Sequence, residues 1–202
     1  MISNPVSRRH LLTTAAAAGL CAALPLPALA LTEARAKTLV DQVVSEINRV
    51  INSGKSVSGM IGDFERIFVR YADVNIIARS TLGADARRAS SAQMRAFTDA
   101  FRGYIARKYG KRFREFIGGQ ITVTGVRPVK SWHEVRARVD LRGQAPFDVL
   151  FLVSDRSGRD LFFDLVIEGI SLRLSERTEI GAMLDRNRGN IDGLVNDLRR
   201  AG

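Results

Sequence analysis

The chain has 202 residues, of which 46% are hydrophobic and 26% are charged, and its formal net charge is +10. This composition is typical of a globular protein and excludes a disordered or low-complexity chain. The length allows one ordinary domain plus a targeting segment, and no run of 18 or more apolar residues beyond the N-terminus predicts a membrane span.

The N-terminal segment, residues 1–30, predicts a cleaved export signal. Arg8-Arg9 precedes an alanine- and leucine-rich run over residues 11–26, and Ala28 and Ala30 occupy the two small-residue positions that a signal peptidase reads. The arginine pair favours a twin-arginine signal. A Sec signal is the alternative.

Cleavage after Ala30 changes the composition of the remaining chain. Residues 31–202 retain 29 basic and 21 acidic side chains, a net charge of +8, and lose the only cysteine, Cys21. A domain without cysteine needs no disulfide bond in an oxidising compartment. We therefore expect a periplasmic protein with a single domain over residues 31–202.

Helices are expected first along this domain. Apolar residues recur at helical spacing in residues 31–52, 59–69 and 74–82. Ser90 or Ser91 is a suitable N-cap for a longer helix that continues to about Ile117. The pattern does not decide whether this helix kinks near Gly110.

After residue 120 the apolar period becomes two. Strands are expected over residues 121–126, 135–141, 147–153 and 161–167, and the almost wholly apolar third strand predicts a central strand covered on both faces. Helices over residues 171–188 and 190–200 close the chain. The order predicts an α+β fold, with helices before and after a curved antiparallel sheet of four to five strands.

Several segments match one known family over essentially all of residues 31–202. The most specific is Asp164–Leu172, which reads D-x-x-x-E-G-I-S-L and precedes a polar helix and a leucine-rich helix. Further matches are Tyr71-Ala72-Asp73-Val74, the helix end Leu82-Gly83, and the aromatic series Phe97, Phe101, Tyr104 and Tyr109. These segments resemble the MlaC / toluene-tolerance family. Leu161-Phe162-Phe163 departs from it, because the family often has a tryptophan there.

The resemblance implies an NTF2-like α+β fold with a deep apolar pocket. It implies a monomeric periplasmic carrier of phospholipid, without a cofactor, that exchanges lipid with an outer-membrane lipoprotein complex and an inner-membrane ABC transporter complex. Such a carrier maintains the lipid asymmetry of the outer membrane. A subgroup associated with hopanoids leaves a polycyclic lipid, or another hydrophobic ligand, as the alternative.

Apolar side chains of the predicted helices and sheet are the candidate lining of this pocket. Periodicity alone does not separate a cavity wall from an ordinary packed core, which is the alternative for each of them. The candidates are Ile76, Ile77, Leu82, Phe97, Phe101, Tyr104, Ile105, Val135, Val139, Val149, Phe151, Leu165, Ile167 and Ile170.

A basic cluster at the end of the long helix is a candidate contact for a partner or for lipid headgroups. It consists of Lys108, Lys111, Arg112 and Arg114. An ordinary solvated face is the alternative. Nucleic-acid binding is disfavoured by the export signal and by the lack of a recognisable motif.

No catalytic arrangement is predicted, so we expect a protein that is not an enzyme. His133 is the only histidine of residues 31–202, Ser171 lacks the second glycine of a nucleophile elbow, and no His/Cys cluster has the spacing of metal ligands. We interpret Asp164 and Glu168 as structural, with Glu168 holding an arginine or a backbone amide. The enzyme alternative is a small isomerase or dehydratase, which requires a buried acid in the pocket.

Overall fold

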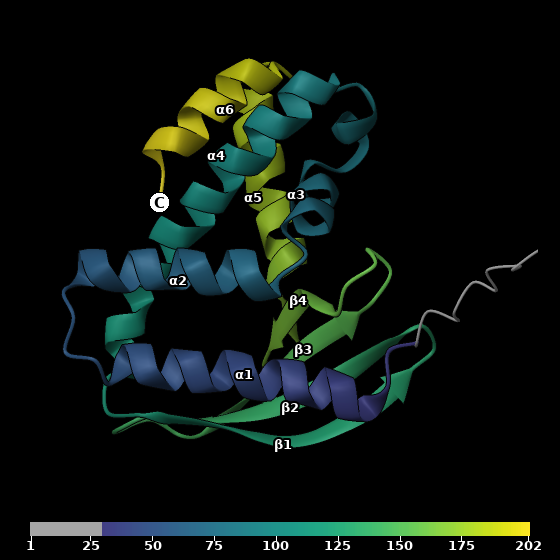
Figure 1. The fold of residues 1–202 in the computed structure, drawn as a ribbon. Coiled ribbons are helices and arrows are strands. Elements are labelled where there is room, and N and C mark those ends of the chain that lie inside the picture. The colour runs from purple at the N-terminus through teal and green to yellow at the C-terminus, as the bar shows by residue number, and fades with distance from the viewer. Residues whose placement is uncertain (1–29) are drawn as a thin grey trace, which may run out of the picture.

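The computed structural model describes residues 30–202, so the predicted export signal lies outside the described residues except for Ala30. Six α-helices, two short 3₁₀ helices and five strands follow in this range (Figure 1). The helices are α1 (Glu33–Ile51), α2 (Val57–Tyr71), α3 (Val74–Leu82), η1 (Gly83–Arg87), α4 (Ser91–Gly110), η2 (Lys111–Phe116), α5 (Leu172–Arg186) and α6 (Ile191–Arg200). The strands are β1 (Gln120–Val129), β2 (Trp132–Asp140), β3 (Phe147–Ser154), β4 (Leu161–Ile167) and β5 (Ile170–Ser171).

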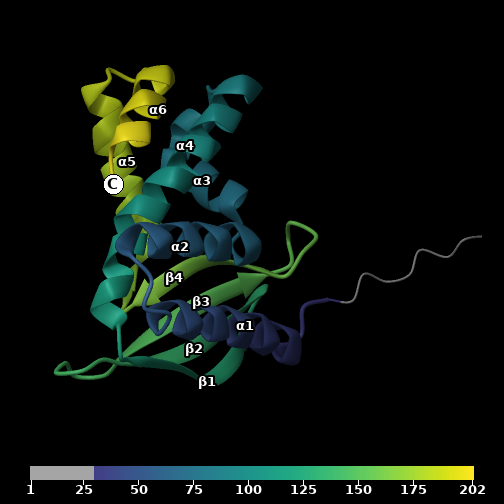
Figure 2. The same ribbon diagram turned by 60° about the vertical axis from the view of Figure 1, so that its left-hand side comes forward.

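The strands form one antiparallel sheet in the order β1-β2-β3-β4-β5. Within the described chain, all helices lie on one side of this sheet, and its other face carries none (Figures 1 and 2). Helix α1 runs along β1 and β2, α2 lies above α1, and α3 to α6 form a group farther from the strands. This architecture confirms the expected α+β fold.

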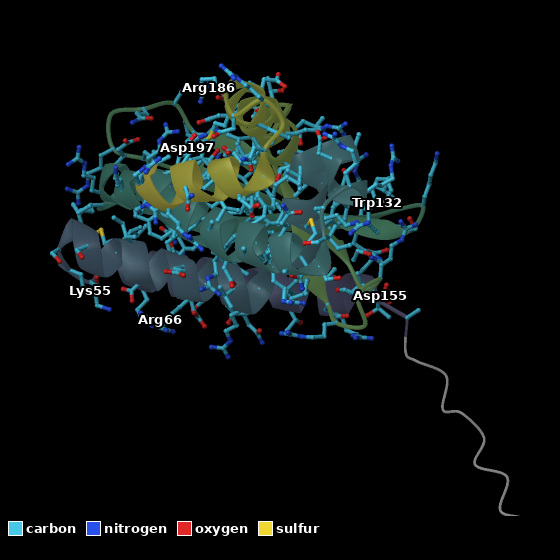
Figure 3. The ribbon with its side chains drawn as sticks, turned by 90° about the horizontal axis from the view of Figure 1, so that it is seen from above. Lys55, Arg66, Trp132, Asp155, Arg186 and Asp197 are labelled. Atoms are coloured by element: carbon cyan, nitrogen blue, oxygen red, sulfur yellow. The ribbon has the colours of Figure 1, made fainter. Side chains whose placement is uncertain are left out.

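Helix α1 spans the sheet from one end to the other. Its N-cap Thr32 accepts a hydrogen bond from the Arg35 amide, and the preceding Leu31 amide donates to Asp155 Oδ2 in the β3–β4 turn at 2.8 Å. Figure 3 shows Asp155 and Trp132 at one end of the molecule and Lys55, just after α1, at the other. The β1–β2 turn, which precedes Trp132, and the β3–β4 turn, which contains Asp155, therefore lie at the same end of the sheet as the start of α1.

Helix α4 is shorter than the sequence pattern predicts. A capping box between Ser90 and Gln93 begins it as expected, but the α-helix ends at Gly110 and the chain continues as the 3₁₀ helix η2. A Cβ atom at Gly110 would lie 2.8 Å from Ile61 Cα, far inside contact distance. Glycine therefore allows α2 to cross α4 closely at the point where α4 ends.

The prediction that β3 is covered on both faces is wrong. Burial alternates along this strand, and Leu150 and Leu152 remain partly exposed on the face without helices. Arg136 is the register partner of Leu150 on β2 and lies beside it on that face. The outward-facing leucines of β3 are covered in part by long polar side chains such as Arg136. The aliphatic part of such a side chain can cover an apolar surface without a second layer of helices.

The D-x-x-x-E-G-I-S-L segment forms the junction from β4 to α5. Glu168 and Gly169 both have positive φ, at 49° and 83°, which is the geometry of a type I′ turn between paired strands. Ser171 then caps α5, and its hydroxyl donates to Asp164 Oδ2 at 2.6 Å. Asp164 Oδ1 also accepts from the Arg173 amide at 3.0 Å. The motif thus fixes the direction in which α5 leaves the sheet.

Candidate ligand-binding cavity

A cavity of about 740 Å³ lies between the inner face of the sheet and the helices α1, α2, α4, η2 and α5. Its volume is in the upper part of the range of ~300–1,000 Å³ found for ligand pockets. The walls are mainly aromatic and aliphatic. They include Val43, Ile47, Phe64, Ile67, Phe68, Phe113, Phe116, Ile121, Leu141, Phe147, Phe162 and Phe163.

The exposed residues of the wall mark where the cavity opens. Arg112 and Glu115 belong to η2, Gln144 and Ala145 to the β2–β3 loop, and Glu168 and Ile170 to the β4–β5 turn and strand β5. Figure 2 shows η2 and the β2–β3 loop at the same end of the sheet. We call this group of six residues the mouth.

Nine of the fourteen residues predicted to line a pocket do line this cavity. They are Ile77, Phe101, Ile105, Val139, Val149, Phe151, Leu165, Ile167 and Ile170. The structure therefore brings the central part of α4, the inner face of the sheet and the β4–β5 hairpin around one space. Contact of these side chains with lipid stays a prediction.

The other five predicted residues lie outside the cavity wall. Ile76 is 46% exposed on α3, whereas Leu82, Phe97, Tyr104 and Val135 are buried in the packed core. Phe97 stacks on Phe101 with ring centroids 5.9 Å apart, but the first turns of α4 lie far from the sheet, among the other helices (Figure 1). Val135 lies towards the hairpin end of β2, near the start of α1.

A large part of the cavity wall, on α2 and η2, was not predicted from the sequence. Phe64, Ile67 and Phe68 share one side of α2, and Phe113 and Phe116 follow the end of α4. The helical spacing of the α2 group was visible, but a buried stripe looks the same whether it faces a core or a cavity. The polar residues Glu176 and Arg173, which also line the cavity, gave no signal, and Tyr109 stood out only as part of the aromatic series and not as a wall residue.

The basic cluster divides into one partly buried residue, Lys108, and three exposed residues. Lys108 forms ion pairs with Glu176 and Glu179, and its contact with a partner or with lipid headgroups stays a prediction. Lys111 donates to the Gly202 carbonyl at 2.7 Å, and Arg112 lies 3.5 Å from Glu115 at the mouth. Among the described residues, Arg114 has no ion pair.

A polar cluster joins α4 to α5 beside the cavity. Lys108 Nζ donates to Glu176 Oε1 at 2.7 Å and to Tyr104 Oη at 2.9 Å, and it also contacts Glu179 Oε2. The Tyr104 hydroxyl donates to Glu179 Oε1 at 2.7 Å. The Tyr109 hydroxyl donates to Glu176 Oε1 at 2.5 Å.

Burial and hydrogen bonding shift the titration of this cluster. Burial, together with the neighbouring carboxylates, raises the pKa of Tyr104 and of Tyr109 above the ordinary value. Burial alone would lower the pKa of Lys108, but hydrogen bonds to Glu176 and Glu179 outweigh it and raise the pKa. Burial opposes ionisation of Glu179, yet hydrogen bonds from Lys108 and Tyr104 lower its pKa.

Asp164 has the structural role that the sequence predicts. Besides its bonds to Ser171 and the Arg173 amide, its Oδ2 lies 3.5 Å from Arg173 Nε, and the side chain is almost fully buried. The Glu168 side chain, in contrast, is exposed in the turn and makes no hydrogen bond or ion pair within residues 30–202. The expected contact of Glu168 with an arginine or an amide is therefore wrong.

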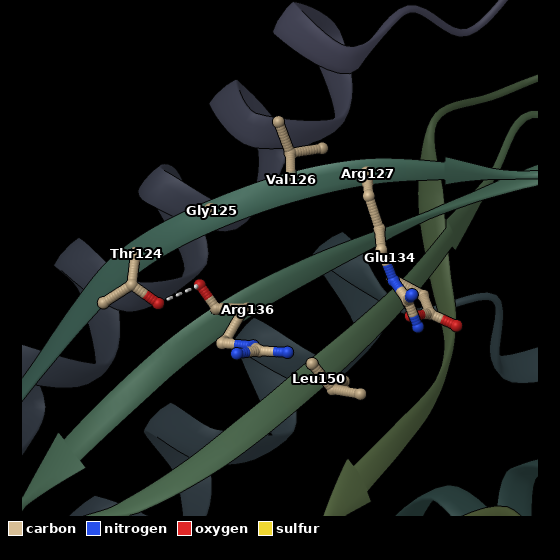
Figure 4. A pocket seen from close by; sticks show the side chains of 7 residues that line it. All are labelled: Thr124, Gly125, Val126, Arg127, Glu134, Arg136 and Leu150. Carbon is tan, nitrogen blue, oxygen red and sulfur yellow. Dashed lines mark hydrogen bonds and ion pairs between the residues drawn. The ribbon is translucent and has the colours of Figure 1, made fainter.

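A second hollow of about 280 Å³ lies on the face of the sheet without helices (Figure 4). It follows the bulge at Thr124–Gly125 and is lined by charged side chains, including the ion pair of Arg127 with Glu134. In residues 30–202, no helix is long and apolar enough to cross a bilayer, and no group of His, Cys, Asp and Glu is arranged to hold a metal ion.

The fold and the cavity define an α+β protein that keeps an open, largely apolar space between one face of a curved sheet and its covering helices. The profile of the family described as MlaC protein matches residues 37–200, and the chain belongs to that family. The predicted family resemblance is thereby confirmed.

A solved structure has a similar fold. It is that of the phospholipid-binding protein from Ralstonia solanacearum in complex with a phospholipid, with a TM-score of 0.67 and 20% sequence identity. The alignment covers 83% of this chain and 94% of that protein. At this identity the likeness establishes the fold alone.

Proposed function

We propose that this protein is a periplasmic carrier that binds phospholipid tails in the cavity and exchanges the lipid between membrane complexes. The observation that supports this most strongly is the open apolar cavity of about 740 Å³ in a member of the MlaC family. The similar fold of a protein solved with bound phospholipid supports the same ligand class.

The physical need for such a cavity follows from the cost of exposing hydrocarbon to water. Each exposed methylene costs about 0.8 kcal/mol, so two long acyl tails cost on the order of 20 kcal/mol. Aromatic and aliphatic walls such as Phe101, Val149 and Ile167 remove that cost while the lipid crosses water.

The mouth gives the carrier a docking surface. Lys111, Arg112 and Arg114 are exposed beside it, and cations near an anionic lipid surface contribute roughly 1 kcal/mol each. In our proposal they contact lipid headgroups or an acidic partner surface, and docking drives loading and release. The partners are an inner-membrane ABC transporter complex and an outer-membrane lipoprotein complex, and the exchange maintains outer-membrane lipid asymmetry.

We further propose that the carrier performs no chemistry on its ligand. Glu176 is a buried acid in the cavity wall, as the isomerase alternative requires, but Lys108 and Tyr109 both bind its carboxylate. A carboxylate engaged in this way favours binding over proton abstraction.

Native mass spectrometry with lipid extraction of the purified protein tests the proposal. We expect one lipid for each protein molecule, and uptake of phospholipid from liposomes by protein stripped of lipid. Extraction of a polycyclic lipid instead would support the hopanoid alternative. Neither co-purified lipid nor uptake from liposomes would contradict the carrier function.

A further inference from the structure

Two isoleucines with exposed side chains lie at the end of the molecule where the cavity opens. Ile117, which directly follows η2, is 52% exposed, and Ile170, at the start of β5, is 62% exposed. They are two of only six large apolar residues that are exposed in residues 30–202. Single exposed apolar residues are ordinary on a protein surface, so the meaning of these two depends on where they lie.

The strand register places both isoleucines at the same end of the sheet. Gln120, the first residue of β1, pairs with Asp140 at the end of β2, and Ile170 pairs with Ile167 at the end of β4. Neighbouring strands lie about 4.8 Å apart, and three to four such spacings separate Ile117, near β1 and β2, from β5. The two side chains are therefore roughly 15–20 Å apart, with the mouth between them.

The turn that carries Ile117 packs closely against the end of β2. A Cβ atom at Gly119 would lie 2.7 Å from the Asp140 carbonyl oxygen, and a Cβ atom at Gly118 would lie 2.9 Å from Arg142 Nε. Gly118 also has a φ of 76°, which favours glycine. The two glycines allow the chain to turn directly on the strand end, so the exposed isoleucine belongs to a closely packed segment.

The surface around the mouth carries an excess of positive charge. Arg114 and Arg142 are exposed, and neither forms an ion pair within the described residues. Of the two carboxylates of the mouth, Glu115 lies 3.5 Å from Arg112, whereas Glu168 has no cation partner in residues 30–202. Two unpaired arginines thus face one unpaired carboxylate, which favours contact with an anionic surface.

An anionic lipid bilayer fits this arrangement better than a protein partner does. Apolar hot spots of protein interfaces cluster near the centre of the contact, whereas here the centre is the opening of the cavity and the isoleucines lie at its sides. A bilayer is broad enough to contact both side chains at once. Its phosphates complement the arginines, and apolar side chains enter the boundary between headgroups and acyl chains.

We propose that the mouth binds directly to an anionic bilayer, with Ile117 and Ile170 inserted below the lipid headgroups. This inference rests on the proposed carrier function for its purpose, because an acyl tail could then pass between bilayer and cavity without crossing water. It adds to that function a membrane contact that needs no partner protein.

Flotation of the purified protein with lipid vesicles tests the membrane contact. The protein is loaded with lipid beforehand, so that an empty cavity does not itself draw the protein to the vesicles. We expect binding to vesicles of phosphatidylcholine and phosphatidylglycerol in equal parts, and much weaker binding to phosphatidylcholine alone. Binding should fall with rising salt, because salt screens the attraction between arginines and phosphates.

Substitutions separate insertion of the isoleucines from attraction between charges. Ile117→Asn and Ile170→Asn should each weaken vesicle binding about tenfold, since less apolar surface leaves water. This loss should persist at high salt, which does not screen apolar burial. Val69→Asn is the matched control, because Val69 is 45% exposed in the last turn of α2, which leads to the start of β4 at the opposite end of the sheet. It should leave binding unchanged, and circular dichroism checks that all three variants fold.

Tryptophan fluorescence locates the inserted end without removing an apolar residue. Trp132 is the only tryptophan and lies at the end of the sheet opposite the mouth. Ile117→Trp combined with Trp132→Phe moves the single indole to the mouth. Vesicles with brominated acyl chains should quench this indole strongly and Trp132 of the unmodified protein weakly. Fluorescence is read directly after mixing, while the cavity still holds unbrominated lipid.

The outcomes separate the membrane contact from the carrier function. The contact would be overturned if the unmodified protein did not float with anionic vesicles, if both isoleucine variants bound as well as it does, or if Val69→Asn lost binding equally. Equal quenching of the two indoles would also overturn it. Lipid held in the cavity is measured separately by native mass spectrometry. A protein that floats with vesicles but never takes up lipid would contradict the carrier function instead.

Discussion

The side chain of Asn48 on α1 forms a pair of hydrogen bonds with the backbone of Ile121 on β1. Asn48 Nδ2 donates to the Ile121 carbonyl at 2.9 Å, and the Ile121 amide donates to Asn48 Oδ1 at 3.0 Å. The amide side chain thus takes the place of a neighbouring strand at the edge of the sheet. Unpaired edge groups invite pairing with another chain, and α1 satisfies them here.

Asn48→Ala should therefore lower the free energy of unfolding by about 2 kcal/mol, since two hydrogen bonds are lost at about 1 kcal/mol each. Urea unfolding followed by circular dichroism measures this. Asn52→Ala is the control, because Asn52 is exposed and bonds only to the Asn48 carbonyl of its own helix. An equal effect of both substitutions would contradict the role of the Asn48–Ile121 pair.

Enlarging one residue of the sheet inside the cavity should displace lipid. Val149 is a buried wall residue of β3, and Val149→Trp places an indole where three or four methylenes would lie. At about 0.8 kcal/mol for each methylene, lipid affinity should fall roughly fiftyfold to two-hundredfold. Liposome uptake measures the loss.

Val69→Trp serves as its control. Val69 is 45% exposed on α2 and does not line the cavity, so the same side chain added there should leave lipid uptake unchanged. Full uptake by Val149→Trp would remove that residue from the lipid-binding wall.

The three exposed cations beside the mouth should set the rate of lipid transfer. Replacing Lys111, Arg112 and Arg114 with Glu should slow transfer to anionic liposomes roughly tenfold to a hundredfold, and less at high salt. A fluorescent-lipid transfer assay at two ionic strengths provides the measurement.

A second triple variant changes the net charge equally at other sites. Arg87, Arg95 and Arg186 are exposed on η1, at the start of α4 and at the end of α5. Their replacement with Glu should have a much smaller effect. If both triple variants transfer lipid equally slowly, net charge and not the surface at the mouth controls the rate.

The α4–α5 cluster should make stability depend on pH. The pKa of Glu179 is lowered in the folded protein, so its contribution is present at neutral pH and is lost as the pH falls through that pKa. The pKa of Lys108 and those of both tyrosines are raised, so their contributions are lost only at strongly alkaline pH. Glu179→Gln should therefore destabilise the protein at pH 7, and the difference from the unmodified protein should shrink below about pH 4.

Urea unfolding at several pH values measures this difference. Glu115→Gln is a suitable reference, because its carboxylate is exposed and lies 3.5 Å from Arg112. A difference for Glu179→Gln that stays constant from pH 7 to about pH 3 would contradict the coupling of Glu179 to Lys108.

The positions of the helices and strands were predicted more completely from the sequence than the faces of these elements that line the cavity. Helix α3 begins and ends at the predicted residues, Val74 and Leu82, because Asp73 caps its start and Gly83 stops it. The end of α4 was not predictable, since it depends on how closely α2 approaches Gly110. Helix caps depend on residues that are adjacent in the sequence, so they can be predicted from it. The point where two helices cross depends on their packing in three dimensions.

Phe97 and Phe101 illustrate why the lining was predicted only in part. They lie one helical turn apart on the same face of α4, and both are fully buried. Only Phe101 lines the cavity. The same face of α4 packs against other helices near the start of α4 and borders the cavity farther along. Val135 and Val139 show the same change along one face of β2.

Side chains along β2 alternate between the two faces of the sheet, and this alternation provides a site for a fluorescent reporter group. Val139 faces the cavity, whereas the preceding Arg138 is exposed on the face of the sheet without helices. Cys21, the only cysteine, belongs to the predicted export signal, so Arg138→Cys would give the remaining chain a single thiol. A fluorophore attached there would stand one peptide unit from the bound hydrocarbon, outside the compartment that holds it, and could follow filling and emptying in real time.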